Sequence, residues 1–231
     1  MMSNSVEVVR LWLAANRIGA VWVPINVELR SISLQHVVDF ANAKLVIVDA
    51  EFVDVLRTVQ LHRQCQLYVN GSVETSSLSS LYTLGQPIVS AVPMKPSDVA
   101  GFLYTSGTIG KSKACALSHQ YFVLQGAALV EAFGLRHNDV LFCLFPLFHV
   151  DATALATIPV ISLGATAASS KQFSASKFRD QIREVNVTVY DFMGATLALT
   201  YKQPPGDRDR HHKVRFAWGV PVPSFVDNYE R

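Results

Sequence analysis

The sequence is short of charge and of cysteine. Only 16% of its 231 residues are charged and 50% are hydrophobic, whereas an average globular domain has roughly a quarter of charged residues. The formal net charge of +2 is too small to indicate binding of nucleic acid or of an anionic membrane. The three cysteines, Cys65, Cys115 and Cys143, lie far apart in the sequence, so neither a disulfide framework nor a CxxC metal site is predicted. A reducing compartment is favoured, so we expect a cytoplasmic protein without a nucleic-acid partner.

We also expect neither a signal peptide nor a membrane span. Glu7 and Arg10 come before the first long apolar stretch, which is not the layout of a signal peptide. Residues 141–168 are apolar over a length that could cross a bilayer. Five residues that interrupt a span stand among them: Pro146, His149, Asp151, Pro159 and Gly164. The segments between these interruptions fit a strand, a turn, a helix and a strand.

Helical and strand-like patterns alternate along the chain. The pattern predicts helices at residues 6–17, at 31 or 33 to 42, and at 52–59, 118–133, 152–161, 175–185, 195–201 and 223–231. It predicts strands at residues 21–24, 45–48, 67–69, 99–104, 140–145, 165–168, 187–190 and 214–218. Such alternation is typical of parallel sheets covered by helices on both faces. The predicted fold is therefore α/β, with two lobes of parallel-rich sheet.

The predicted domains follow from a change in composition. Residues 71–96 are rich in Ser, Pro and Thr and show little periodicity, so we expect a linker there. Residues 1–70 then form a first α/β lobe, and residues 97–231 form a second lobe.

The most informative segment runs from Tyr104 to Ala114, with the sequence YTSGTIGKSKA. An apolar strand-like run at 99–104 leads into it, so the chain is expected to leave the core there and turn sharply. Its small residues expose backbone N–H groups, and hydroxyls and cations stand among them: Thr105, Ser106, Thr108, Lys111 and Lys113. Polyphosphate needs many donors at close range together with positive charge. The segment therefore predicts a phosphate-binding loop in the second lobe.

A P-loop is one alternative for this segment. Gly110-Lys111-Ser112 fits the second half of the P-loop pattern. Thr105 stands where that pattern needs its first glycine, and a β-branched residue does not adopt the same backbone geometry. A P-loop NTPase, which would depend on Lys111, stays open as a third hypothesis.

The segment resembles the signature loop of the adenylate-forming ligases (acyl-CoA synthetases, luciferases and peptide-synthetase adenylation domains), which reads Tyr-Thr-Ser-Gly-Thr-Thr-Gly-x-Pro-Lys-Gly. Seven positions match: Tyr104, Thr105, Ser106, Gly107, Thr108, Gly110 and Lys113. Ile109, Ser112 and Ala114 depart from the pattern.

The resemblance extends along nearly the whole chain. Residues 10–26 resemble the family's early helix–strand unit, and Phe145-Pro146-Leu147-Phe148-His149 resembles its second short motif. Trp218-Gly219-Val220-Pro221 resembles the strand end that packs on adenine. Residues 202–205 are most similar to the carnitine/crotonobetaine-CoA ligase branch.

The resemblance implies an AMP-forming acid–thiol ligase. Such an enzyme uses ATP and Mg²⁺ to activate a carboxylic acid as an acyl adenylate, and then transfers the acyl group to CoA. The nucleotide-binding residues that it implies are Thr105, Ser106, Gly107, Thr108, Gly110, Lys113, Gly219, Val220 and Pro221. His149 and Phe148 would bind the acid, although a core histidine is an equal explanation for His149. No metal-binding residues are predicted, because Asp207, Asp209, His211 and His212 fit a solvated charged loop.

The resemblance covers only the N-terminal region of the family. The family's Tyr-Gly-x-Thr-Glu motif, ribose-binding aspartate and C-terminal domain with its catalytic lysine are expected beyond Arg231. We therefore expect an incomplete N-terminal region that is inactive alone. A non-catalytic homologue that binds nucleotide or a partner is the alternative.

Overall fold

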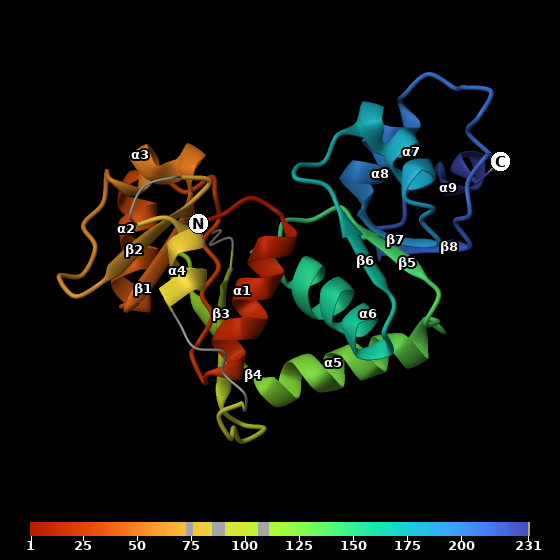
Figure 1. The fold of residues 1–231 in the computed structure, drawn as a ribbon. Helices are drawn as coiled ribbons and strands as arrows, with labels where there is room; N and C mark the ends of the chain where they lie inside the picture. Colours follow the sequence, from red (N-terminus) through yellow and green to blue (C-terminus); the bar gives the residue numbers. More distant parts are fainter. Residues whose placement is uncertain (73–75, 85–90, 106–110, 231) are drawn as a thin grey trace. The chain divides into compact units, whose positions relative to one another are not determined.

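The computed structural model describes residues 1–72, 76–84, 91–105 and 111–230 (Figure 1). The chain divides into two compact units, residues 1–120 and 121–231. This grouping differs from the predicted linker at residues 71–96, because β3 (Val99–Tyr104) packs with the N-terminal segment. Trp22 N donates to Ala100 O at 3.0 Å, and Phe102 N donates to Trp22 O at 2.9 Å. The predicted domain boundaries stay a prediction.

The described residues of unit 1 form one parallel and one antiparallel pair of strands. Its elements are α1 (Val6–Arg17), α2 (Ser31–Ala41), β1 (Leu45–Asp49), the 3-10 helix η1 (Ala50–Phe52), α3 (Val53–Leu56), β2 (Gln66–Asn70), α4 (Leu78–Leu84), β3 and β4 (Ala114–Ser118). Strands β1 and β2 are parallel, whereas β3 and β4 form an antiparallel pair. The parallel pair agrees with the prediction. Strand β4 was not predicted, and its antiparallel pairing with β3 stands beside the predicted parallel-rich sheets.

The sequence explains α1 fully. Ser5 accepts a hydrogen bond from Val8 N at 3.3 Å and so caps the helix, as serine does at this position. Val8 and Trp12, four residues apart on one face, are buried. The predicted bounds of 6–17 are confirmed. Helix α2 begins at Ser31, and its N-cap residue is Arg30. Neither of the two predicted caps, Ser31 and Ser33, therefore occupies the N-cap position.

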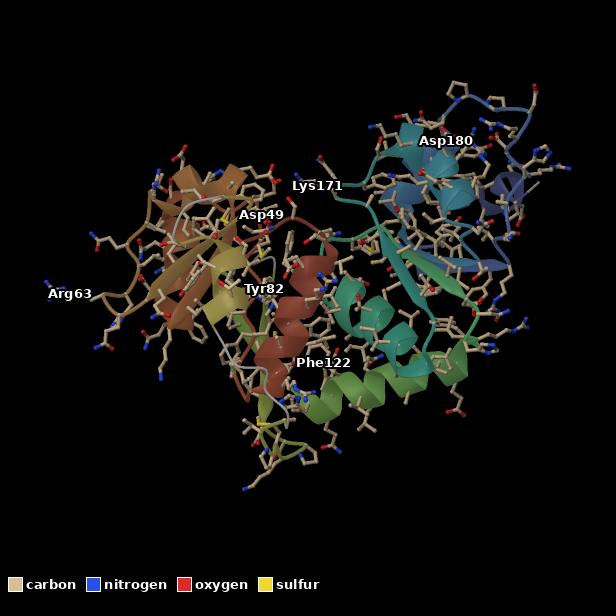
Figure 2. The ribbon with its side chains drawn as sticks, in the orientation of Figure 1. Asp49, Arg63, Tyr82, Phe122, Lys171 and Asp180 are labelled. Carbon is tan, nitrogen blue, oxygen red and sulfur yellow. The ribbon has the colours of Figure 1, made fainter. Side chains whose placement is uncertain are left out.

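The core of unit 1 lies between α2 and the parallel strands. It includes Leu34, Val37, Val46, Val48 and Leu56. Asp49, labelled in Figure 2, is the last residue of β1. It accepts hydrogen bonds from Ser3 N and from Asn70 Nδ2, both at 2.8 Å. This carboxylate therefore ties the first residues of the chain to the end of β2.

Unit 2 is built on a four-stranded parallel sheet. Helix α5 (His119–Ala132) begins at the division between the units, and the other elements are β5 (Val140–Cys143), the π-helix η2 (Asp151–Thr157), α6 (Ile158–Leu163), β6 (Thr166–Ser169), α7 (Ala175–Glu184), β7 (Val189–Met193), α8 (Gly194–Tyr201), β8 (Phe216–Val220) and α9 (Val226–Tyr229). The strand order is β6-β5-β7-β8, and every neighbouring pair is parallel. The predicted α/β class is confirmed.

Helices cover both faces of this sheet. Phe142 and Tyr190 point to the face on which Phe178 and Ile182 of α7 and Leu197 of α8 form the core. Figure 1 shows α6 on the other face. Within the described residues, no helix combines the length and the apolar character needed to cross a bilayer.

A buried ion pair locks the amino ends of three strands. Asp139, which precedes β5, is 3% exposed and accepts two bonds from Arg215, from Nη2 at 2.6 Å and from Nε at 3.1 Å. Thr188 Oγ1 and Arg136 N donate to it as well, both at 2.7 Å. Burial acts to raise the pKa of Asp139, but these donors outweigh burial and the pKa lies below its ordinary value.

We predict that Asp139→Ala destabilises unit 2. The change leaves the Arg215 guanidinium without its carboxylate and removes the bond that joins β5 to Thr188 before β7. A loss of about 2–4 kcal/mol in the free energy of unfolding is expected, measured by urea denaturation. Asp207→Ala, at an exposed carboxylate, is the control. Equal stability of the two variants would contradict the prediction.

Candidate functional site

The described part of the signature segment is the stem of a hairpin. Tyr104 pairs with Ala114 at the end of the β3–β4 ladder. Beyond it, Thr105 N donates to Lys113 O at 3.0 Å, and Lys113 N donates to Thr105 Oγ1 at 3.3 Å. The stem thus holds Thr105 and Lys113, two predicted nucleotide-binding residues, side by side.

Four other predicted residues of the loop, Ser106, Gly107, Thr108 and Gly110, lie outside the described residues. Their contacts with phosphate stay a prediction.

The hairpin bears on the P-loop hypothesis. A P-loop leads from its strand into a helix, whose N-terminus contributes to phosphate binding. Here the segment leads into β4, and helix α5 begins only at His119. The geometry around Lys111 and Ser112 therefore differs from that of a P-loop.

A second candidate region lies at the carboxyl edge of the unit 2 sheet. The chain leaves β5 toward β6 on one side, and it leaves β7 toward β8 on the other side. Parallel sheets bind ligands where neighbouring connections diverge in this way, outside the carboxyl ends of the strands. The predicted acid-binding residues, Phe148 and His149, follow β5 and so lie on this edge.

His149 is not a core histidine. Its side chain is 53% exposed, and its Nδ1 lies 2.5 Å from Asp151 Oδ2. The hydrogen bond to Asp151 raises the pKa of His149, against an opposing effect of burial. With Nδ1 bound by Asp151, His149 can present Nε2 to a ligand. Phe148 is half-buried beside it. Binding of an acid by these two residues stays a prediction.

Sequence reasoning missed a buried carboxyl group between β5 and β7. Asp191 is 3% exposed. Cys143 Sγ donates to its Oδ2 at 3.2 Å, and Leu144 N donates to its Oδ1 at 3.1 Å. Burial raises the pKa of Asp191 to about 7, and nearby Asp151 acts in the same direction. Burial likewise raises the pKa of the Cys143 thiol.

Asp191 holds the chain where it leaves β5, because its carboxyl group accepts from Leu144 N directly after that strand, ahead of the predicted acid-binding residues. The only signal in the sequence was an acidic residue within an apolar strand run at 189–193. A strand in such a run is expected to be buried on both faces, and an aspartate buried there needs partners.

The predicted adenine-binding residues lie at the end of β8. Val220 is 67% exposed, and Pro221 is also exposed. Gly219 pairs with Phe192, and a Cβ atom on Gly219 would overlap the Phe192 carbonyl oxygen. Close packing of β7 on β8 therefore requires glycine here, whether or not a base approaches. Contact of these three residues with nucleotide stays a prediction.

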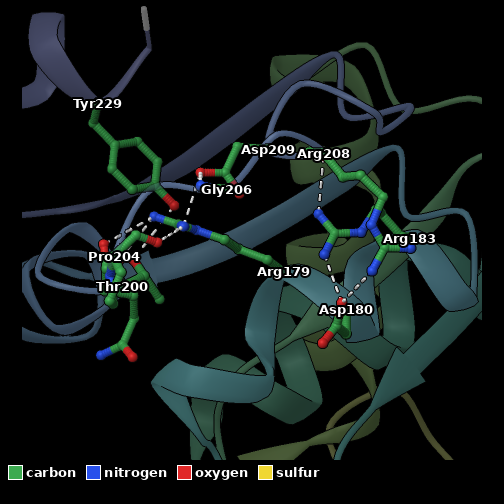
Figure 3. Close-up of polar contacts among 10 residues, drawn as sticks. Arg179, Asp180, Arg183, Thr200, Pro204, Gly206, Arg208, Asp209 and Tyr229 are labelled. Carbon is green, nitrogen blue, oxygen red and sulfur yellow. Dashed lines mark hydrogen bonds and ion pairs between the residues drawn. The ribbon is translucent and has the colours of Figure 1, made fainter.

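The charged loop at residues 202–213 is bound to α7 through two arginines (Figure 3). Arg179 donates to Pro204 O at 2.6 Å and pairs with Asp209 at 2.8 Å. Arg183 donates to Arg208 O at 3.0 Å and pairs with Asp180 at 2.6 Å. Across the described ranges, no group of three or more His, Cys, Asp or Glu side chains could hold a metal ion.

Comparisons with known proteins agree with the resemblance of the loop. A family model described as AMP-binding enzyme matches residues 1–226. Long-chain fatty acid transport protein 6 of Homo sapiens is 29% identical over 235 residues, which cover 98% of this chain and 38% of that protein. The crotonobetaine/carnitine–CoA ligase of Salmonella arizonae is 29% identical over 224 residues, which cover 93% of this chain and 43% of that protein.

A solved structure shows the same fold. The inhibitor-bound N-terminal domain of FACL13 from Mycobacterium tuberculosis superposes with a TM-score of 0.84 at 25% identity, covering 100% of this chain and 58% of that chain. The chain thus spans between about a third and a half of the length of the two relatives named above, from 38% to 43%.

We predict that Asp191 makes the protein less stable as the pH rises. Between about pH 4 and pH 7 the carboxyl group holds its proton in the folded protein but has lost it in the unfolded chain. The unfolded chain then binds fewer protons, so raising the pH through this window favours unfolding. The total effect is on the order of 4 kcal/mol.

The measurement compares urea unfolding of the wild type and of Asp191→Asn at pH 4.5, 6.0 and 7.5. The asparagine variant should gain stability relative to the wild type at each step. Asp227→Asn, at an exposed carboxylate, is the control and should follow the wild type. Parallel pH profiles for wild type and Asp191→Asn would show that Asp191 is ionised in the folded protein.

Proposed function

This chain belongs to the AMP-binding enzyme family, and we propose that it supplies the ATP-phosphate site and part of the acid pocket of an AMP-forming acid–thiol ligase. In the proposed reaction a carboxylate oxygen attacks the α-phosphorus of ATP and pyrophosphate leaves. The CoA thiol then replaces AMP on the acyl carbon. The match of residues 1–226 to the family is the observation that carries this proposal.

The hairpin in unit 1 supports the phosphate site. Polyphosphate binding needs donors and positive charge at fixed positions, because most of the catalysis is positioning and charge stabilisation. The stem fixes Thr105 and Lys113 relative to each other. Thr105 can donate its hydroxyl to a phosphate oxygen, and Lys113 supplies the charge.

The carboxyl edge of unit 2 supports the acid pocket. An acid that binds there meets Phe148 for its apolar part and His149 for its carboxylate. The hydrogen bond that Nδ1 donates to the Asp151 carboxylate favours a protonated imidazole, which can also donate from Nε2 to a bound carboxylate. The two relatives are named for a long-chain fatty acid and for crotonobetaine and carnitine. Acids of both kinds are therefore candidate substrates.

Mg²⁺ is part of the proposal as a partner of ATP. The described residues offer no cluster of three metal-ligating side chains, so they do not fit a protein cage for the ion. Its ligands would have to come chiefly from phosphate oxygens and water, as is common for Mg²⁺. A cytoplasmic location is also proposed, since Cys65, Cys115 and Cys143 are free thiols.

The function is tested by acid-dependent exchange of pyrophosphate into ATP. The assay uses a protein that carries this chain within a polypeptide of the relatives' full length, with fatty acids, carnitine and crotonobetaine as substrates. Exchange that requires one of these acids supports the proposal. ATP binding without any exchange would favour a non-catalytic homologue.

We predict that the 231-residue chain alone binds ATP without forming acyl-CoA. It spans only 38% to 43% of the length of the two relatives. The resemblance places the family's ribose-binding aspartate and catalytic lysine in parts of the family that residues 1–231 do not match. Each missing electrostatic group is worth about 10²- to 10³-fold in rate. AMP and thioester should stay at background with ATP, Mg²⁺, CoA and the acid panel. Turnover at an ordinary enzymatic rate of about 1–10³ per second would contradict the prediction.

We predict that ATP binding depends on Lys113 more than on Lys111. Lys113 is held in the hairpin stem opposite Thr105, whereas Lys111 lies in the bend before it. Lys113→Ala should weaken ATP binding by about 1–3 kcal/mol, the range for losing a charge-assisted contact. Lys111→Ala, a matched change of an exposed lysine two residues away, should cost less in calorimetry. A larger loss from Lys111→Ala would favour the P-loop hypothesis.

A further inference from the structure

Helix α2 contacts the Lys113 end of the hairpin through His36. Its Nε2 lies 2.9 Å from the carbonyl oxygen of Ser112, and the two residues are 76 positions apart in the chain. A carbonyl oxygen can only accept a hydrogen bond, so Nε2 carries the proton in this contact. The Ser112 carbonyl therefore selects the Nε2–H tautomer of His36. A doubly protonated ring would carry the same Nε2–H donor.

The contact fixes the peptide unit that carries Lys113. The Ser112 carbonyl and the Lys113 N–H belong to one planar group. His36 binds its oxygen end at 2.9 Å, and Thr105 Oγ1 accepts from its N–H end at 3.3 Å. A planar group bound at both ends leaves little freedom in the adjoining torsions of Lys113. These torsions set the direction in which the lysine side chain leaves the backbone.

The helix that carries His36 is itself held firmly. Its residues Leu34 and Val37 are buried in the core of unit 1, at 0% and 1% exposure. On the hairpin side, the ring of Phe40 meets the rings of Phe102 and Tyr104 edge-on, with centroids 6.0 and 6.2 Å apart. Because α2 is fixed by the core, its contact through His36 fixes the backbone at Ser112 and Lys113 relative to the core of unit 1.

We propose that His36 is a positioning residue for nucleotide binding, which aligns Lys113 with the phosphates by holding the Ser112 carbonyl. The inference rests on the proposed function, because it assumes that Lys113 contacts ATP. It adds a residue of α2, outside the signature segment, to the machinery of the phosphate site. His36 acts on the nucleotide only through the backbone of the hairpin.

Three substitutions of His36 separate the hydrogen bond from general packing. Glutamine places its amide nitrogen close to the position of Nε2 and can donate to Ser112. Asparagine places its amide nitrogen near Nδ1 and falls short of Ser112, and leucine removes the donor. His137→Leu, at an exposed histidine in unit 2, is the control.

The expected results concern the affinity for Mg·ATP, measured by calorimetry. His36→Leu and His36→Asn should weaken it about 5- to 30-fold, whereas His36→Gln should stay within about threefold of the wild type. His137→Leu should leave it unchanged. Rescue by glutamine alone would identify the donor at Nε2, because a loss of packing would affect all three variants.

A double-mutant cycle tests whether His36 works through Lys113. In the Lys113→Ala background, His36→Leu should change the affinity by less than about twofold, since the side chain that it aligns is gone. A loss as large as in the wild-type background would overturn the inference.

The outcomes distinguish the inference from the proposed function. If Lys113→Ala weakens ATP binding but the His36 variants do not, the positioning role is wrong and the proposed function stands. If the wild type does not bind ATP, or if Lys113→Ala binds it equally well, the proposed phosphate site is wrong and the inference falls with it. Should His36→Leu fail to fold, the glutamine and asparagine pair decides the question.

Discussion

The pairing of Asp139 with Arg215 is the interaction on which the arrangement of unit 2 depends. One carboxylate, 3% exposed, receives donors from the segments before β5, β7 and β8. Removing that much charge from water is unfavourable unless every lone pair is bound, and here four donors bind it. These contacts hold the amino ends of the three strands together.

The opposite edge of the same sheet uses a carboxyl group differently. Asp191 accepts hydrogen bonds from a thiol and from one N–H, and among the described contacts it forms no ion pair with a cationic side chain. Burial then dominates and favours the neutral form, whereas the guanidinium at Asp139 favours the charged form. At the amino edge, Asp139 is therefore a charged group in an ion pair. At the carboxyl edge, Asp191 is a neutral buried group, in the same region as His149 and Asp151. We expect ligands at the carboxyl edge, because the hydrogen-bonding groups of the Asp139–Arg215 pair are already occupied by each other and by their neighbours.

Much of the secondary structure could be read from local pattern, whereas the hairpin could not. Helix α1 has its cap and its buried stripe within twelve residues, so its bounds were predictable. Strand β4 follows the loop directly and has only five residues, ACALS, with no turn signal before the next helix. Its partner is β3. That pairing depends on backbone hydrogen bonds, and the residue types of β4 do not predict it. Likewise, the predicted linker contains α4, whose Leu78 is buried at 3% exposure.

The sequence by itself determined the family and the α/β class. It also predicts a phosphate-binding loop, because small residues, hydroxyls and a lysine stand together in one run. Tertiary structure decided which groups act together. His36 meets Ser112 across 76 residues, and Asp191 meets Leu144 across 47. Such pairs depend on which strand or helix comes to lie beside another, and local propensity carries no information about that. The pKa of Asp191 was equally hidden, since it follows from burial and neighbours that exist only once the sheet has formed.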